Sequence, residues 1–118
     1  MKFYTFNDPK DAYFALDDVL PEGAKEIGFN STDAAVEKHV PEVKVEGKAI
    51  LVEVGSVAHP MLDVHYIKWI LLENDGQVQV KALKPNDKPE ARFAVEELKP
   101  GARVFAFCNL HGLWVKNL

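Results

Sequence analysis

The chain has 118 residues, a formal net charge of −4 and an estimated pI of 5.5; 47% of the residues are hydrophobic and 27% are charged. This length suits one domain with a hydrophobic core and is too short for two full domains. The acidic balance argues against a nucleic-acid partner, which needs a basic face. A single cysteine excludes an intrachain disulfide framework and fits a reducing compartment. With no apolar run of membrane-spanning length and no signal-peptide core at the start, we expect a cytoplasmic protein that does not bind membranes.

Residues 1–30 form an N-terminal segment that contains no cysteine, and we expect no metal in it. Asp8 followed by Pro9 is typical of a helix start, and the apolar residues that follow recur near helical spacing. A Pro and a Gly at positions 21 and 23 then form a stop signal. The segment therefore predicts a short helix over residues 9–19.

From residue 41 onward the pattern is that of short β-strands separated by turns. A single helical turn is expected just before them, over residues 34–38. The expected strands lie at 43–45, 49–54, 65–72, 77–83, 91–95, 102–107 and 113–116. The sequence Asn74-Asp75-Gly76 is a strong hairpin signal between two of them. About seven strands with turns at this spacing predict an all-β, immunoglobulin-like β-sandwich in residues 31–118.

All four histidines and the only cysteine fall at element ends or in loops. They are His39, His59, His65, Cys108 and His111. For a single histidine a satisfied hydrogen bond is the commoner role, and a lone cysteine is more often a small buried hydrophobe. However, loops at one edge of a sandwich can converge on one point. A Cys-x-x-His step also lets a thiolate and an imidazole from one tight turn reach the same ion. Together these residues predict a shared metal site.

The donor set points away from some metals and leaves two other kinds of protein to consider. Five candidate ligands exceed the four of a closed structural zinc site, whereas imidazole and thiolate suit iron. A cupredoxin-like copper electron carrier would also be a β-sandwich with a late Cys followed by His. Its site usually needs an axial Met, yet no Met follows His111 and two histidines would have no role. A non-catalytic immunoglobulin-like module with a structural metal is the other alternative.

Four ordered motifs make residues 31–118 resemble the superoxide reductase family, which includes the desulfoferrodoxins and neelaredoxins. The motifs are Glu37-Lys38-His39-Val40-Pro41, His59-Pro60-Met61, His65-Tyr66-Ile67-Lys68-Trp69-Ile70 and Cys108-Asn109-Leu110-His111-Gly112-Leu113-Trp114. The resemblance implies one mononuclear iron per chain, alternating between Fe²⁺ and Fe³⁺. It implies that four imidazoles lie in the equatorial plane, those of His39, His59, His65 and His111. The Cys108 thiolate would be axial, and the sixth position would be open in the ferrous state.

The resemblance also implies the reaction: ferrous iron, superoxide and two protons give ferric iron and hydrogen peroxide, without dioxygen. A thiolate opposite the open position donates electron density, which favours one-electron reduction of a small oxidant. A 2+ ion with one thiolate and four neutral imidazoles keeps a charge of about +1, which attracts the superoxide anion. We assign Lys38 to guiding and holding superoxide. We expect Glu37 to ligate the ferric state on the product side.

The chain departs from the desulfoferrodoxins in its N-terminal segment. Those proteins carry an N-terminal four-cysteine domain with a second iron, and residues 1–30 here contain no cysteine. We therefore expect a one-iron superoxide reductase whose electrons come from rubredoxin or a similar small donor. The resemblance suggests a homodimer or tetramer. We also expect the backbone N–H groups of Asn109 and Leu110 to hydrogen-bond the Cys108 sulfur and tune its redox behaviour.

Overall fold

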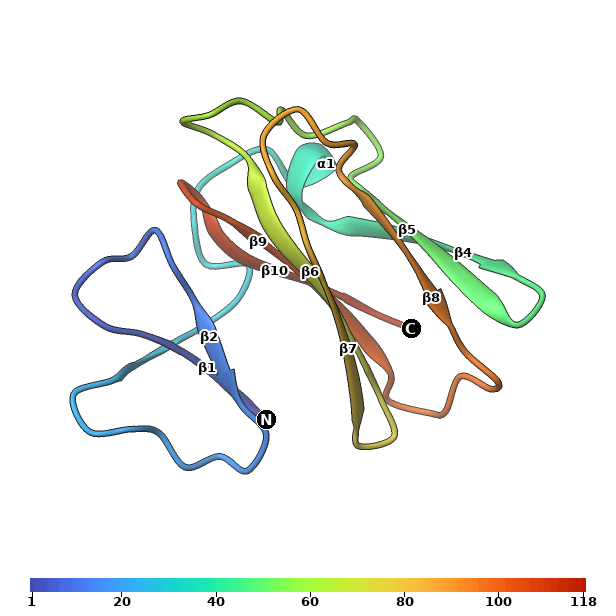
Figure 1. Ribbon diagram of the computed structural model, residues 1–118, viewed down its shortest axis with the longest axis horizontal. Helices are drawn as coiled ribbons and strands as arrows, with labels where there is room; N and C mark the ends of the chain where they lie inside the picture. Colours follow the sequence, from blue (N-terminus) through green and yellow to red (C-terminus); the bar gives the residue numbers. More distant parts are fainter.

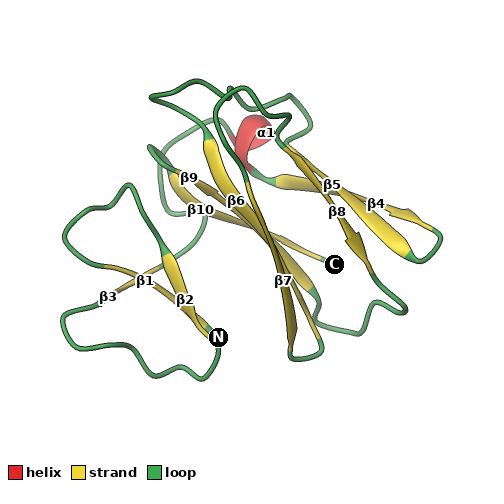
Figure 2. Ribbon diagram, viewed as in Figure 1, coloured by secondary structure: helices red, strands yellow, loops and turns green.

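The computed structural model describes residues 1–118 and is almost entirely β (Figure 1; Figure 2). Its strands are β1 (Lys2–Thr5), β2 (Tyr13–Ala15), β3 (Lys25–Ile27), β4 (Pro41–Glu46), β5 (Ala49–Val54), β6 (Ile67–Asn74), β7 (Gln77–Ala82), β8 (Glu90–Ala94), β9 (Arg103–Cys108) and β10 (Gly112–Asn117). The helix α1 (Val36–His39) is a single turn, close to the one predicted over residues 34–38. No helix is therefore long and apolar enough to cross a membrane.

Strands β4 to β10 form the predicted seven-stranded sandwich. One sheet has the order β10-β9-β6-β7 and the other has the order β4-β5-β8. Alternate residues of β5 point inward, so Ile50, Val52 and Val54 are fully or almost fully buried. They pack in one core cluster with buried residues of β6, β8 and β9, including Cys108. The cysteine that the sequence singled out therefore lies at the end of the core.

The β6–β7 hairpin turns where the sequence predicted it. Asp75 and Gly76 both have positive φ, at 51° and 77°. Positive φ at both central residues is the conformation that matches the twist of the flanking strands. The turn then sets the register that pairs Asn74 with Gln77.

The N-terminal segment is a small sheet of order β2-β1-β3, so the helix predicted over residues 9–19 is wrong. Asp8 does make a local cap, because its carboxylate accepts a hydrogen bond from the Lys10 N–H at 2.9 Å, but only a turn follows. The chain then pairs β2 with β1. This pairing lets Phe3 bury itself on the outer face of the four-stranded sheet, with its ring centroid 4.6 Å from that of Phe105. Burial of an aromatic side chain outweighs a weak local preference for helix.

Three connections meet at one end of the sandwich (Figure 1). These are α1 before β4, the long loop between β5 and β6, and the tight turn between β9 and β10. The predicted metal ligands lie on these three connections.

Candidate metal centre

His39 is the last residue of α1, and only 2% of it is exposed. Its Nδ1 lies 2.6 Å from the Ala35 carbonyl oxygen, one helical turn earlier. A carbonyl can only accept a hydrogen bond, so Nδ1 carries the proton and Nε2 has a free lone pair. The helical turn therefore aims an unprotonated nitrogen into the site.

His59 is held in the same way by the β5–β6 loop. Its Nδ1 donates to the Pro60 carbonyl oxygen at 2.6 Å, which again leaves Nε2 with a free lone pair. That Nε2 lies 3.1 Å from Nε2 of His39. The ring is buried, with 3% exposed.

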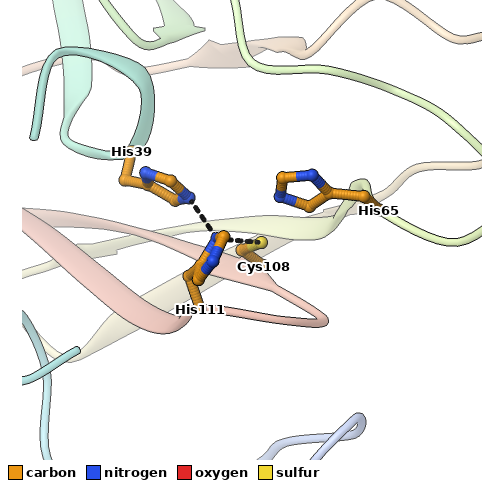
Figure 3. Close-up of side chains that lie close together, drawn as sticks. All are labelled: His39, His65, Cys108 and His111. Atoms are coloured by element: carbon orange, nitrogen blue, oxygen red, sulfur yellow. Dashed lines mark hydrogen bonds between the residues drawn. The ribbon is translucent and has the colours of Figure 1, made fainter. Parts of the chain in front are cut away.

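Cys108 and His111 come from the β9–β10 turn (Figure 3). Cys108 ends β9 and is fully buried. Gly112 has φ 79°, a conformation that glycine adopts without strain and that closes the turn. Nδ1 of His111 lies 3.9 Å from the Cys108 sulfur and 3.2 Å from Nε2 of His39. One tight turn therefore supplies both a sulfur and a nitrogen, as its Cys-x-x-His spacing predicted.

His65 completes the cluster from the end of the β5–β6 loop. It was predicted to open a strand, but β6 begins at Ile67 and His65 instead forms an isolated bridge with Leu62. Its ring centroid lies 4.7 Å from that of His59 and 5.0 Å from that of His111. Its Nε2 is buried without any hydrogen-bond partner. A buried polar atom with no partner is costly, which indicates that something else satisfies it.

The five predicted ligands thus gather at one point, and their arrangement fits a bound metal ion. The donor atoms of His39, His65, Cys108 and His111 all lie within 4.8 Å of one another. Nε2 of His59 lies next to this group, 3.1 Å from Nε2 of His39. Two unprotonated nitrogens do not attract each other, yet Nε2 of His39 and Nε2 of His59 lie 3.1 Å apart. Nitrogens at right angles around an ion with bonds of about 2.1 Å would be about 3.0 Å apart. A metal ion would also satisfy Nε2 of His65.

Burial keeps the imidazoles in the form that binds metal. It lowers the pKa of His39, His59 and His65, and that of His59 falls from 6.5 to about 4. These rings are therefore neutral at pH 7. Burial also raises the pKa of the Cys108 thiol. Metal binding must therefore displace the thiol proton.

The Cys108 sulfur accepts backbone hydrogen bonds that partly oppose the effect of burial on its pKa. They come from the N–H groups of Leu110 and His111. The prediction of Leu110 as a donor is confirmed, but that of Asn109 is wrong. The Asn109 N–H donates instead to the Tyr66 carbonyl at 3.3 Å, because the chain at that point still runs beside the start of β6.

Glu37 and Lys38 lie on α1 beside His39, and both are exposed. The Glu37 carboxylate is outside the cluster of donor atoms, and the Glu37 backbone carbonyl accepts a hydrogen bond from the Val57 N–H at 2.9 Å. Both charges reach the site: Glu37 contributes to raising the pKa of His39, and Lys38, a smaller cause, contributes to lowering the pKa of both His39 and His65, each after the larger effect of burial.

Gly55, which sequence reasoning missed, sets how closely α1 approaches the β5–β6 loop. A Cβ atom there would lie 2.6 Å from the Glu37 carbonyl oxygen and 2.8 Å from that of Val40. Only a glycine permits this contact. The available signal was a glycine directly after a buried strand, which often marks close backbone approach.

Comparison with known proteins gives the family. The family model described as desulfoferrodoxin matches residues 31–117. A desulfoferrodoxin homolog from Archaeoglobus fulgidus is 52% identical over 90 residues, covering 76% of this chain and 70% of that protein. A superoxide reductase from Pyrococcus abyssi is 35% identical over 103 residues, covering 73% of this chain and 90% of that protein.

Solved structures indicate the same family. The superoxide reductase from Treponema pallidum superposes with a TM-score of 0.72 at 40% identity, covering 79% of this chain and 77% of that one. The one-iron superoxide reductase from Giardia intestinalis superposes with a TM-score of 0.62 at 32% identity, covering 70% of this chain and 97% of that one. The cupredoxin alternative has no support in these comparisons or in the four-histidine cluster. With this fold and this donor set, the chain belongs to the desulfoferrodoxin family of superoxide reductases.

Proposed function

We propose that this chain is a one-iron superoxide reductase and that its iron is held by five residues. They are His39, His59, His65, Cys108 and His111. The reaction adds one electron and two protons to superoxide and yields hydrogen peroxide. Iron bound in the cluster would supply the electron. The observation that carries the proposal is the convergence of imidazole nitrogens and a buried cysteine around Nε2 of His65, which has no hydrogen-bond partner.

The chain's own residues prepare the site for an anion. Ring hydrogen bonds to backbone carbonyls fix the orientation of His39 and His59, and outer contacts of this kind support ligand geometry. The N–H groups of Leu110 and His111 stabilise the Cys108 thiolate. Neutral imidazoles would cancel none of the charge of a bound ion, and only the thiolate would reduce it. The site would therefore keep a positive charge that attracts superoxide.

Metal analysis and an anaerobic assay test this function. We expect about one iron per chain, since the donor set serves a single ion. Superoxide should be consumed with formation of hydrogen peroxide and without dioxygen. Two irons per chain would contradict the expectation that residues 1–30 hold no metal. A copper-loaded protein that is inert toward superoxide would contradict the function itself.

The electrons would come from a separate small carrier such as rubredoxin. The chain has a single cysteine and therefore cannot hold a second, four-cysteine iron centre. Large aliphatic side chains are exposed on each connection that carries a ligand, which suits contact with another protein. These are Val36, Val57, Leu62, Val64 and Leu110. Rapid reduction of the ferric protein by reduced rubredoxin would support this donor.

We further propose that the protein works in the cytoplasm and as a homodimer or tetramer. The free, buried Cys108 needs a reducing compartment if it is to remain available as a thiolate. Sedimentation velocity would measure the oligomeric state directly.

Lys38 should steer superoxide to the site. Because the chain is acidic overall, a local positive charge is needed to counter its far field. Electrostatic focusing raises on-rates by about 10-fold to 10³-fold and weakens as salt shortens the Debye length. We therefore expect Lys38→Ala to slow the second-order reaction with superoxide by about tenfold or more and to flatten its salt dependence. Lys38→Arg should keep most of the rate.

Pulse radiolysis across a salt series measures these rates. The matched control is Lys116→Ala, because Lys116 is exposed near the opposite end of β10 from His111. A rate for Lys38→Ala equal to that of the wild type at low salt would remove Lys38 from the mechanism.

Glu37 should act after the reaction rather than during it. Its carboxylate is exposed next to the helical turn that ends in His39, so a modest loop movement could bring it to the open position. A carboxylate is a hard ligand that prefers ferric to ferrous iron. Glu37→Ala should leave the bimolecular rate with superoxide nearly unchanged and shift the absorption of the ferric form. A collapse of that rate would make Glu37 a participant in the reduction.

The metal-free protein should lose stability in mild acid. The pKa of His59 falls from 6.5 to about 4 on folding. Between pH 6.5 and about pH 4, His59 is therefore protonated in the unfolded chain and neutral in the folded chain. The free energy of unfolding should therefore decrease as the pH falls below 6.5, by about 2 kcal/mol between pH 7 and pH 5 from this residue. Urea titrations of wild type and His59→Gln measure the difference. Equal losses in the two proteins would contradict it.

A further inference from the structure

His65 is held less directly than two of the other histidines. The rings of His39 and His59 are each fixed by a hydrogen bond from Nδ1 to a carbonyl of the same connection. His65 makes no such bond, and its Nε2 has no partner at all. The place of its ring must therefore be set by its backbone.

Part of that backbone is fixed within the β5–β6 loop. The Leu62 N–H donates to the His65 carbonyl at 2.9 Å, and the His65 N–H donates to the Leu62 carbonyl at 3.1 Å. Both residues belong to the same loop. This pair shapes the loop but does not fix its distance from Cys108, which lies on β9.

The hydrogen-bonded pairing of β6 with β9 ends before it reaches His65. Ile67 pairs with Cys108, and a register shift separates this pair from the regular pairing that begins at Trp69. Beyond Ile67 there is no further regular pair, and His65 lies just past that point. Some other group must tie the loop of His65 to the turn of Cys108.

Asn109 supplies that tie with both ends of its side chain. Its Oδ1 accepts a hydrogen bond from the Tyr66 N–H at 3.0 Å, and its Nδ2 donates to the Val64 carbonyl at 3.1 Å. Val64 and Tyr66 are the two neighbours of His65. The Asn109 N–H adds a third bond, to the Tyr66 carbonyl. Asn109, directly after Cys108, is therefore hydrogen-bonded to the backbone on both sides of His65.

We propose that Asn109 is a positioning residue that fixes the His65 imidazole relative to the Cys108 sulfur. It acts through the backbone and is not itself a ligand. The proposal rests on the proposed function for the identity of the metal, but the three hydrogen bonds belong to the chain itself. Without the side chain, the segment from Val64 to Tyr66 keeps only the backbone bond from the Asn109 N–H and loses the other two, and Nε2 of His65 moves away from the other donors.

Asn74, the last residue of β6, offers a matched control. It makes the same pair of bonds at the far end of β6: its Nδ2 donates to the Glu97 carbonyl at 3.0 Å and its Oδ1 accepts from the Lys99 N–H at 2.9 Å. Asn74→Ala therefore removes an equivalent amide clamp far from the metal ligands. A purely structural role for Asn109 would make the two alanine variants behave alike.

Two measurements separate positioning from general stability. In the metal-free full chain, NMR reports the exchange rate of the Tyr66 amide and the chemical shifts of the His65 ring. We expect Asn109→Ala to speed that exchange about fivefold or more and to shift the His65 ring signals. Titration with Co²⁺ alone should show an affinity about 10-fold lower than that of the wild type. Asn74→Ala should leave the Tyr66 exchange rate, the His65 ring shifts and the Co²⁺ affinity unchanged.

Asn109→Asp is the conservative variant and covers the case in which Asn109→Ala does not fold. It keeps the acceptor for the Tyr66 N–H and loses the donor to Val64, so Tyr66 protection should be retained while the Val64 contact is lost. Unchanged His65 signals in both Asn109 variants, or equal Co²⁺ losses in Asn109→Ala and Asn74→Ala, would overturn the proposal. A chain that bound no iron would defeat the proposed function, whereas the metal-free NMR result would still decide the role of Asn109.

Discussion

Cys108→Ser is expected to abolish both the visible band of the ferric protein and its reaction with superoxide. The band would arise from charge transfer between the Cys108 thiolate and iron, so the oxidised wild-type protein should be blue. A serine hydroxyl is a far weaker donor and stays protonated at neutral pH, so the electron density that Cys108 supplies is lost. The loss of rate should exceed the roughly 10-fold to 100-fold range typical of residues that only support a ligand.

Absorption spectroscopy and pulse radiolysis on the same sample measure both losses. The exchange of sulfur for oxygen is nearly isosteric, so circular dichroism should show an intact fold although Cys108 is fully buried. A variant that keeps the visible band would show that the sulfur is not a ligand. A variant that keeps the superoxide rate while losing the band would show that the thiolate is not needed for the reduction.

Gly55→Ala is expected to destabilise the fold, although it adds only one methyl group and lies outside the candidate ligand set. The new methyl group would lie 2.6 Å from the Glu37 carbonyl oxygen and 3.2 Å from the Lys38 carbonyl carbon. These are backbone atoms of α1, so the clash can be relieved only by moving the turn that carries His39. Overpacking of this kind costs about 1–3 kcal/mol of unfolding free energy. The displaced His39 should also weaken metal binding.

Chemical unfolding and a Co²⁺ titration measure the two effects. Gly28→Ala is the control, because a Cβ at Gly28 meets no atom within 4 Å and its φ is not in the left-handed region. That substitution should change the free energy of unfolding by no more than about 0.5 kcal/mol. If Gly55→Ala were as mild as the control in both measurements, the close packing of α1 would not matter for the site.

The sequence by itself determined the seven strands of the sandwich and the residues that gather at its end. Strand positions follow from alternation and turn chemistry, which are local properties; the positive φ of Asp75 and Gly76 repeats what their residue types imply. The Cys108 to His111 step is local as well, because one tight turn joins both donors. The remaining candidate ligands were predicted from the family motifs, because their loops lie far apart along the chain.

The N-terminal segment shows where local signals fail. Asp8 and Pro9 favour a helix start, and Asp8 does cap a turn. The helix does not follow, because β1 pairs with β2 and buries Phe3 against the four-stranded sheet. A marginal helix of about three turns has little stability of its own, so packing decides the outcome.

Only the tertiary structure decided how the candidate ligands are oriented and held. Which nitrogen of His39 is free depends on the distance to the Ala35 carbonyl, and the tight fit at Gly55 depends on a helix that precedes it by many residues. The link from Asn109 to the neighbours of His65 spans 43 and 45 positions of the sequence. Such contacts form between segments that meet only after the sheets are assembled. Their geometry is therefore absent from any local pattern of residues.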